Sequence, residues 1–323
     1  MRILHLGPIE AKGGISSVMK TLTDYGSGNL TNYVINTHSS SGIIQKIRTF
    51  IHARRLLISK LTSEKIDVVH IHSASDFSFL RKIRFARIAL NRGINVVFHI
   101  HSGDLSRWLT EKNRSKKYSK LFSDSRISLV CLSDYWVNEF ESLLGESTVI
   151  ANPINPIHKP SAPKVDGKLC LLGRNDSVKG HQFAIELVER MNANGIPVNL
   201  HCTGINKTHS EYVTCHGWLP DEVKVDLISS SQITLIPSKF EGLPVIALES
   251  LACGTNVLAN KSIFGLPEAT NSADDYDFED WEKKIVDILE KKNDVNLVDS
   301  ASEFSQQKIC QRWIEYYSKI INS

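Results

Sequence analysis

Short apolar runs rich in β-branched residues alternate with longer segments of helical spacing along the first half of the chain. The runs RILHLG, NYVINT, DVVHIHS, NVVFHIHS and RISLVCLS predict strands. Between them apolar residues recur every three or four positions, as in Ile43, Ile47, Ile51 and Ile58, which is typical of amphipathic helices. Strands that alternate with helices predict βαβ units around a parallel sheet buried on both faces.

Residues 152–167 interrupt this pattern with four prolines and no periodicity, and we expect an interdomain linker over residues 153–167. The alternation resumes with KLCLLGR, VNLHCTG, QITLIPS and TNVLAN. The fold class is therefore α/β, with tandem Rossmann-like, doubly wound parallel-sheet domains over residues 1–152 and 168–305 that face each other across a cleft. Residues 306–323 predict an amphipathic C-terminal helix, and the pattern leaves open whether it crosses back to the N-terminal domain.

Length and composition agree with two ordinary globular domains. The chain has 323 residues, of which 41% are hydrophobic and 23% charged. Six cysteines occur without a CxxC pair, which indicates a reduced, cytoplasmic compartment. The first residues lack the features of a signal peptide, and no apolar run reaches the ~18 residues that span a bilayer.

Charge is unevenly distributed along the chain. Residues 1–150 hold 21 Lys and Arg against 12 Asp and Glu, or +9, whereas the remainder holds −6, for a net charge of +3. Basic residues lie along three predicted helices, and Trp108, Leu109, Tyr118, Leu121 and Phe122 flank the third. We expect this half to dock on an anionic membrane surface, at the inner face of the cell membrane. Nucleic acid is not expected, because no recognition motif is present, and an uneven but merely solvated surface is the alternative.

A turn in the second half combines two cations with the start of a helix. Arg174 and Lys179 follow the strand KLCLLGR, and Gly180 precedes helical sequence. Such a turn can hold a phosphate pair, since backbone amides and the helix dipole add to two full charges. A surface loop with two unrelated cations is the alternative for this pair taken alone.

Two carboxylates frame the segment EGLPVIALE. Pro244 suits a helix start, Gly242 allows close approach of a ligand, and Glu241 and Glu249 lie before and within the helix. Carboxylates that accept from vicinal hydroxyls hold riboses and hexoses. Alternatively, Glu241 is a helix-dipole partner and Glu249 a solvated carboxylate.

Together these motifs resemble glycosyltransferase family 4, retaining enzymes of the GT-B fold, of the bacterial surface-polysaccharide type. The resemblance implies that Arg174 and Lys179 bind the donor diphosphate and Glu249 the ribose. It also implies that Glu241 contacts the transferred sugar, helped by the backbone amides of Gly242 and Leu243. In the loop PIEAKGGIS it implies that Gly13 and Gly14 let the backbone approach the donor phosphate and the acceptor, although a plain βα turn is the alternative.

Histidines end two neighbouring predicted strands of the first half. The period of two places His99 and His101 on one sheet face. The family has a histidine beside the transferred sugar at this strand end, which implies that role for His101. A metal bound by His70, His72, His99 and His101 is the alternative, but no Asp, Glu or Cys has metal-ligand spacing. We read Asp275-Tyr276-Asp277 as helix capping, and expect no metal and no cofactor.

The expected activity is a retaining, metal-independent hexosyl transfer. A hexose or N-acetylhexosamine would move from a nucleoside diphosphate sugar, most readily a UDP-sugar, to a hydroxyl of a glycan or lipid-linked oligosaccharide. The N-terminal domain would bind the acceptor and the C-terminal domain the donor, in cell-surface polysaccharide biosynthesis. A nucleotide-sugar epimerase or phosphorylase on the same fold is one alternative, and a non-catalytic nucleotide- or glycan-binding subunit is another.

Overall fold

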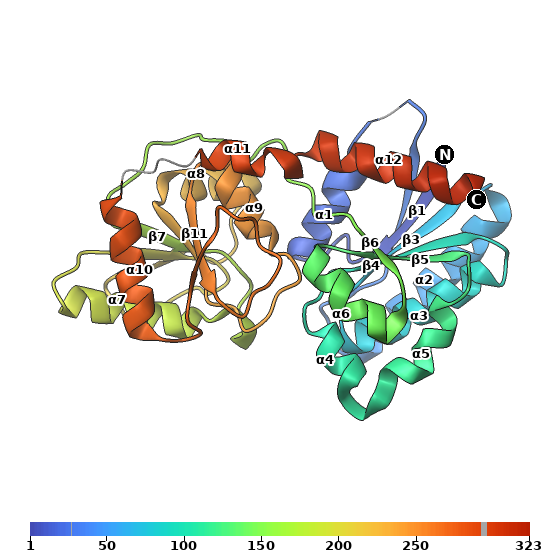
Figure 1. Ribbon diagram of the computed structural model, residues 1–323, viewed down its shortest axis with the longest axis horizontal. Coiled ribbons are helices and arrows are strands. Elements are labelled where there is room, and N and C mark those ends of the chain that lie inside the picture. Colours follow the sequence, from blue (N-terminus) through green and yellow to red (C-terminus); the bar gives the residue numbers. More distant parts are fainter. Residues whose placement is uncertain (27, 292–295) are drawn as a thin grey trace. The chain divides into compact units, whose positions relative to one another are not determined.

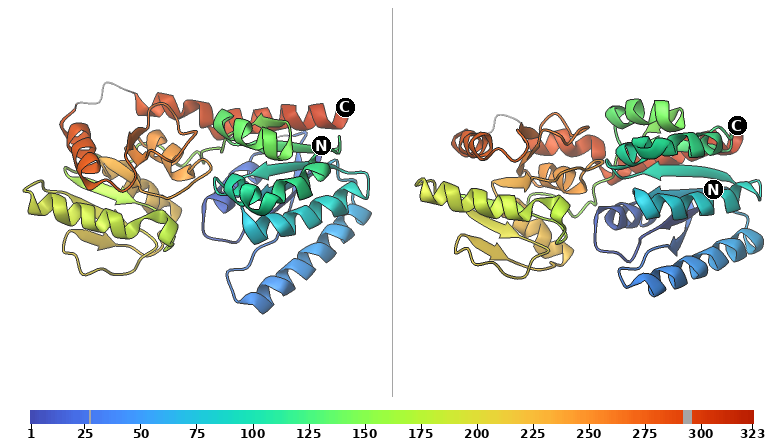
Figure 2. Two further views of the ribbon diagram at one scale, coloured as in Figure 1. Left: turned by 60° about the horizontal axis from the view of Figure 1, so that its bottom comes forward. Right: turned by 90° about the horizontal axis from the view of Figure 1, so that it is seen from below.

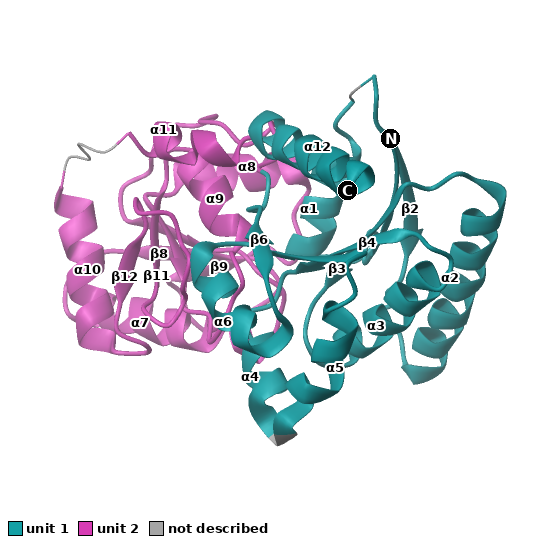
Figure 3. Ribbon diagram, turned by 45° about the vertical axis from the view of Figure 1, so that its right-hand side comes forward, with its two compact units in different colours: residues 1–153, 306–323 teal, residues 154–305 magenta. Residues whose placement is uncertain are grey.

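The computed structural model describes residues 1–26, 28–291 and 296–323 (Figure 1). The chain forms two compact units, each built around one parallel sheet. Unit 1 comprises Met1–Pro153 and Gln306–Ser323, and unit 2 comprises Ile154–Ser305 (Figure 3). No helix among these residues is both long and apolar enough to cross a membrane.

The sheet of unit 1 has six parallel strands in the order β2-β1-β3-β4-β5-β6. Its centre is buried on both faces, as the nearly unbroken burial of β3 and β4 shows, because helices cover the sheet on either side. The strands are β1 (Arg2–Gly7), β2 (Thr31–Asn36), β3 (Val68–Ser73), β4 (Asn95–Ile100), β5 (Ile127–Cys131) and β6 (Ser147–Val149).

Two sets of helices cover this sheet (Figures 2 and 3). The C-terminal helix α12 belongs to unit 1, where Trp313 and Tyr317 are buried and Asn95 Nδ2 donates to Ile320 O at 3.2 Å. It lies beside α1, whose Thr21 O accepts from Gln306 Nε2 at 2.7 Å. The helices are α1 (Gly14–Thr23), α2 (Ile43–Ser63), α3 (Asp76–Leu90), α4 (Leu105–Thr110), α5 (Arg114–Phe122), α6 (Asp134–Leu144) and α12 (Gln306–Asn322), with a 3-10 turn at Glu111–Asn113.

Unit 2 repeats the architecture, with strand order β12-β11-β10-β7-β8-β9. Its core includes Leu187 of α7 and Trp281 of α10. The strands are β7 (Lys168–Leu171), β8 (Asn199–Cys202), β9 (Val213–Cys215), β10 (Ile233–Ile236), β11 (Asn256–Asn260) and β12 (Asn271–Ala273). The helices are α7 (His181–Ala193), α8 (Asp221–Ser230), α9 (Val245–Ala252), α10 (Phe278–Glu290) and α11 (Leu297–Ala301), with 3-10 turns at Ser177–Lys179 and Ser302–Phe304.

Residues 154–167, within the interdomain linker predicted over residues 153–167, are part of unit 2. Ile154 forms a bridge with Ser305, and Lys164 Nζ donates to Ser231 O at 2.8 Å. Ser161 Oγ donates to Asp226 Oδ1 of α8 at 2.7 Å. The prolines prevent regular structure, but the polar side chains between them fasten the extended chain to unit 2.

Candidate functional site

The turn after β7 is fixed against the end of β10. Asp176 caps the 3-10 turn by accepting from Val178 N at 3.1 Å, and Lys239 N donates to Val178 O at 2.9 Å. Gly180 has a φ of +73°, and a Cβ there would lie 2.2 Å from Pro237 O. Only glycine fits this close approach, so α7 begins directly beside the loop that follows β10.

The structure brings Lys179 and Glu241 together from these two loops. Lys179 Nζ donates to Glu241 Oε1, and both side chains are mostly buried. Arg174 lies differently, because its guanidinium is largely exposed and 3.9 Å from Asp176 Oδ2. One lysine therefore sits between a carboxylate and a helix N-terminus, with an arginine on the same turn.

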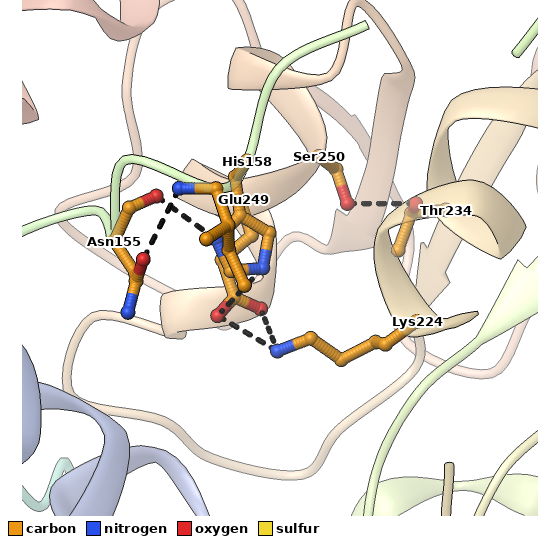
Figure 4. A network of polar contacts seen from close by, with 7 residues as sticks. Asn155, His158, Lys224, Thr234, Glu249 and Ser250 are labelled. Atoms are coloured by element: carbon orange, nitrogen blue, oxygen red, sulfur yellow. Dashed lines mark hydrogen bonds and ion pairs between the residues drawn. The ribbon is translucent and has the colours of Figure 1, made fainter. Parts of the chain in front are cut away.

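Glu249 lies inside α9, and only 3% of it is exposed. Lys224 Nζ, from α8, donates to both carboxylate oxygens, at 2.9 and 3.0 Å (Figure 4). His158 Nε2 lies 3.3 Å from Glu249 Oε1, but it does not have hydrogen-bond geometry. Burial alone would raise the pKa of Glu249, but the positive charge of Lys224, with a smaller effect of His158, lowers it below its usual value. Glu249 is therefore a buried, ionised carboxylate that is not a solvated helix residue.

Sequence reasoning missed both partners of Glu249. His158 lies in the proline-rich segment, where Asn155 O contacts its Nδ1 at 3.1 Å (Figure 4). Lys224 lies on a helix without a recognisable motif. The sequence gives little indication of these contacts, since each residue is far from Glu249 along the chain. The available clue is that an ionised carboxylate on a buried helix face requires a cation nearby.

The backbone around Glu241 and Glu249 agrees with the expected helix start. Gly242 and Leu243 are buried just before Pro244, the residue that precedes α9. Gly254, after the end of α9, has a φ of +68°, which suits its place beyond the helix C-terminus. Gly242 and Leu243 therefore lie at a helix N-terminus, where amides favour an anion.

In unit 1, Gly13 and Gly14 form the start of α1, directly after β1. Gly13 is the N-cap with a φ of 148°, a region that favours glycine, and no side chain caps the helix. These glycines and His101 belong to unit 1, whereas Lys179 and Glu241 belong to unit 2.

His101 follows β4 and is half-buried within a group of histidines. Its Nε2 lies 3.0 Å from His72 Nδ1, and the Asn152 side chain makes a hydrogen bond with the same ring. Burial, together with the charge of Lys82, lowers the pKa of His101 to about 3. Its imidazole is therefore neutral at physiological pH and already oriented by protein groups.

The Asp275-Tyr276-Asp277 string caps a helix, as predicted. Asp277 Oδ1 accepts from Glu279 N at 2.9 Å and from Asp280 N at 3.2 Å at the start of α10. Asp275 Oδ1 accepts from Ser262 N at 3.0 Å. Both carboxylates therefore accept hydrogen bonds from backbone N–H groups.

The apolar residues beside the third basic helix are buried or partly buried within unit 1. Leu109 and Tyr118 are buried, and the rings of Trp108, Tyr118 and Phe122 pack on Phe79 of α3. Part of their apolar area is therefore used within unit 1, and membrane docking by this helix stays a prediction. An exposed stripe lies on α2 instead, made of Ile43, Ile44, Ile47 and Ile51, whose exposed fractions are 76%, 70%, 54% and 43%.

Comparison with known proteins agrees with this geometry. Residues 155–308 match the family described as Glycosyl transferases group 1, and residues 22–157 match Glycosyltransferase Family 4. A relative from Klebsiella pneumoniae, an uncharacterized 41.2 kDa protein in the cps region, is 20% identical over 90% of this chain and 89% of its own.

Solved structures show the same fold. Sucrose-phosphate synthase from Thermosynechococcus elongatus superposes with a TM-score of 0.77 over all of both chains, at 13% identity. The pneumococcal O-GlcNAc transferase GtfA, in complex with UDP and GlcNAc, gives a TM-score of 0.63 at 12% identity over 84% of this chain and 60% of its own. Two matched families and two parallel sheets lead to one conclusion: the chain belongs to glycosyltransferase family 4 and has the GT-B fold.

Proposed function

We propose that the protein is a retaining hexosyl- or N-acetylhexosaminyltransferase that uses a nucleoside diphosphate sugar. A UDP-sugar is the preferred candidate for this donor. The acceptor would be a hydroxyl of a glycan or lipid-linked oligosaccharide. The observation that carries the proposal is the Lys179–Glu241 pair beside the start of α7. When a donor binds, the lysine in this position can donate hydrogen bonds to the diphosphate in place of part of its interaction with the carboxylate. The carboxylate can then accept from sugar hydroxyls.

The donor would be held along unit 2. Lys179 and Arg174 bind the diphosphate, and the exposure of Arg174 leaves its side chain free to turn toward a ligand. Glu241 and the amides of Gly242 and Leu243 contact the sugar. Glu249 accepts from the ribose hydroxyls, and Lys224 keeps it ionised for that purpose.

Catalysis would depend on charge and orientation. The diphosphate leaves with a developing negative charge, and Lys179, Arg174 and helix N-termini stabilise that charge. Same-face attack by the acceptor hydroxyl, with its proton passing to the donor phosphate, retains the anomeric configuration. No metal is needed for this step, because the two cations supply the charge. From unit 1, Gly13 and Gly14 would approach the phosphate, and His101 would contact the sugar.

The relatives support a role in cell-surface polysaccharide biosynthesis. The Klebsiella pneumoniae relative is named for the cps region, and the pneumococcal neighbour was solved with UDP and GlcNAc. An epimerase or phosphorylase of the same fold remains the second candidate. It would release nucleotide without an acceptor, or require inorganic phosphate, whereas a transferase requires a glycan hydroxyl.

A thermal-shift panel of UDP, GDP, ADP and their sugars tests donor binding, because a ligand that binds the folded state raises its melting temperature. We expect the nucleotide and nucleotide sugar of one base to raise the melting temperature of the wild type. Most of this increase should be lost in Lys179→Met. Lys261→Met is the matched control, since Lys261 pairs with Asp274 on the exposed surface of the same unit. Equal shifts in both variants would contradict the assignment of Lys179.

The membrane-docking surface of this enzyme would be α2. This helix contains no acidic residue, carries Lys46, Arg48, Arg54 and Arg55, and exposes four isoleucines. A basic helix with an exposed apolar stripe lies in the interface of an anionic bilayer, here at the inner face of the cell membrane. Flotation with phosphatidylglycerol vesicles should fall in Ile43→Ser/Ile47→Ser and stay unchanged in Val223→Ser, an exposed valine of unit 2. Equal flotation with neutral vesicles would remove the proposal.

A further inference from the structure

Five histidines line the face of the unit 1 sheet that α12 covers. His5 lies on β1, His70 and His72 lie on β3, and His99 and His101 lie on and just after β4. Four of them are buried and His101 is half-buried. The ring nitrogens contact other imidazoles, the Tyr317 hydroxyl and the amides of Asn32 and Asn152.

We propose that His72, His99 and His101 form a binding site for one divalent transition-metal ion, with Zn²⁺ as the best match. One nitrogen of each ring lies within 4.8 Å of one nitrogen of the others. The closest pair, His72 Nδ1 and His101 Nε2, is 3.0 Å apart. A tetrahedral Zn²⁺ with bonds of about 2.0–2.1 Å separates its ligand nitrogens by about 3.3 Å, so this pair needs to open by only a few tenths of an ångström, while His99 would turn toward the ion.

The orphaned nitrogen of His99 points independently to a ligand. His99 Nδ1 contacts His70 Nε2 at 3.2 Å, but His99 Nε2 is buried without a hydrogen-bond partner among the described residues. Its ring centroid is 4.0 Å from that of His101. A buried polar atom without a partner is costly, and a bound cation at this point would supply the missing interaction.

The remaining nitrogens of the three ligands are already oriented. His72 Nε2 lies 3.1 Å from His5 Nδ1, and His5 Nε2 lies 3.3 Å from Asn32 Oδ1. Since Asn32 Oδ1 can only accept, His5 donates from Nε2 and accepts at Nδ1 from His72 Nε2. His72 Nδ1 is thereby left as an acceptor that can bind a metal, as second-shell hydrogen bonds arrange in metal sites.

The partners of His99 are arranged in the same way. His70 stands between His99 Nδ1 and the Tyr317 hydroxyl, which lies 2.6 Å from His70 Nδ1. With the ion bound, His99 carries its proton on Nδ1 and donates to His70 Nε2, His70 donates from Nδ1 to the Tyr317 hydroxyl, and the proton of His101 lies on Nδ1. Each imidazole thus remains neutral and no proton is released.

A second trio, His5, His70 and His72, meets the same distance criterion but is fully enclosed. We prefer the first trio because His101 is half-buried, which allows an ion to enter and a water to complete the coordination. Three imidazoles without a carboxylate or thiolate suit Zn²⁺, Cu²⁺ or Ni²⁺ rather than Mg²⁺ or Ca²⁺. The site is thus distinct from the metal-free diphosphate site of Lys179 and Arg174 proposed in unit 2. Its metal binding does not depend on the transfer reaction.

Metal uptake by the full-length protein tests the site. The protein is dialysed against a chelator, freed of it, and titrated with Zn²⁺ by calorimetry and with Co²⁺ by visible absorption. The variants are His99→Gln and His101→Asn, the latter at a less buried position that is expected to fold. The control is His201→Gln, which removes one member of a histidine pair in unit 2 whose nitrogens are 2.9 Å apart.

We expect one ion per chain in the wild type and in His201→Gln, with tetrahedral Co²⁺ absorption. At least a tenfold loss of affinity is expected in His99→Gln and in His101→Asn. Failure of the folded wild type to bind Zn²⁺ or Co²⁺ overturns the proposal, as does unchanged binding in both ligand variants. Loss of binding in His201→Gln alone would place the ion in unit 2 and would equally overturn it.

Discussion

Replacing Lys224 by methionine would leave Glu249 as a buried carboxylate without its main cation. Breaking a buried pair by removing one partner costs about 3–5 kcal/mol. Because 20% of the Lys224 side chain is exposed, water can partly replace it, and we expect a value near the lower end, about 3 kcal/mol. Urea unfolding of wild type and Lys224→Met at pH 7 measures this loss.

The pH dependence separates loss of the charge pair from loss of packing. In the wild type the pKa of Glu249 is lowered, so its contribution to stability is present above its unfolded pKa of about 4.3 and is lost as the pH falls through the folded pKa. In Lys224→Met burial dominates and raises the folded pKa, so stability is present below about pH 4.3 and is lost as the pH rises. The cost of the substitution should therefore shrink from pH 7 to pH 4.

A double-mutant cycle supplies the control. Glu249→Gln removes the charge, so the double variant Lys224→Met/Glu249→Gln should recover much of the stability lost by Lys224→Met alone. If the two substitutions are additive, or if the penalty of Lys224→Met is the same at pH 4 and pH 7, the reasoning about this pair is refuted.

Three further predictions concern other parts of the molecule. Burial lowers the pKa of His5 to about 4, and that of His101 to about 3 with a contribution from Lys82, so unit 1 should lose stability as the pH falls from about 6.5 toward these values; an unchanged melting temperature between pH 7.5 and pH 5 would contradict this. Gly180→Ala should destabilise unit 2 by more than 1 kcal/mol beyond Gly195→Ala, because both have positive φ but only the first meets a carbonyl oxygen; equal urea midpoints would count against it. Glu241→Gln should reduce sugar transfer at least tenfold while nucleotide binding stays within a few-fold, and unchanged turnover would exclude a sugar contact.

The sequence predicted the features that depend on local pattern. The alternation of apolar runs with segments of helical spacing predicts both parallel sheets. Strands such as β3 and β4 are buried on both faces, and their sequences therefore contain no charged residues that would mark a solvent face. Glycine and proline around Glu241 likewise placed the start of α9. Short edge strands such as β9 and β12 have few apolar residues, and they are recognisable only from their neighbours.

Long-range contacts could not be predicted in the same way. The period of two placed His99 and His101 on one face, but strand order decides that His5 of β1 lies beside His72 of β3. The pairing of Glu249 with Lys224 depends on how α8 and α9 pack, which no local motif encodes. The packing of Trp108 and Tyr118 on Phe79 of α3 could not be predicted either, because an amphipathic pattern does not say which neighbour covers the apolar face.

The central claim is that unit 2 binds a nucleoside diphosphate sugar and that transfer retains configuration at the anomeric carbon. Proton NMR of the reaction mixture tests this directly. The mixture contains the nucleotide sugar that raises the melting temperature and a glycan acceptor, and the coupling constant of the new anomeric proton reports the configuration of the anomeric carbon. From an α-linked donor we predict an α-linked product in the wild type, and at least a hundredfold slower reaction in Lys179→Met. A β-linked product, or equal rates in the two proteins, would contradict the account.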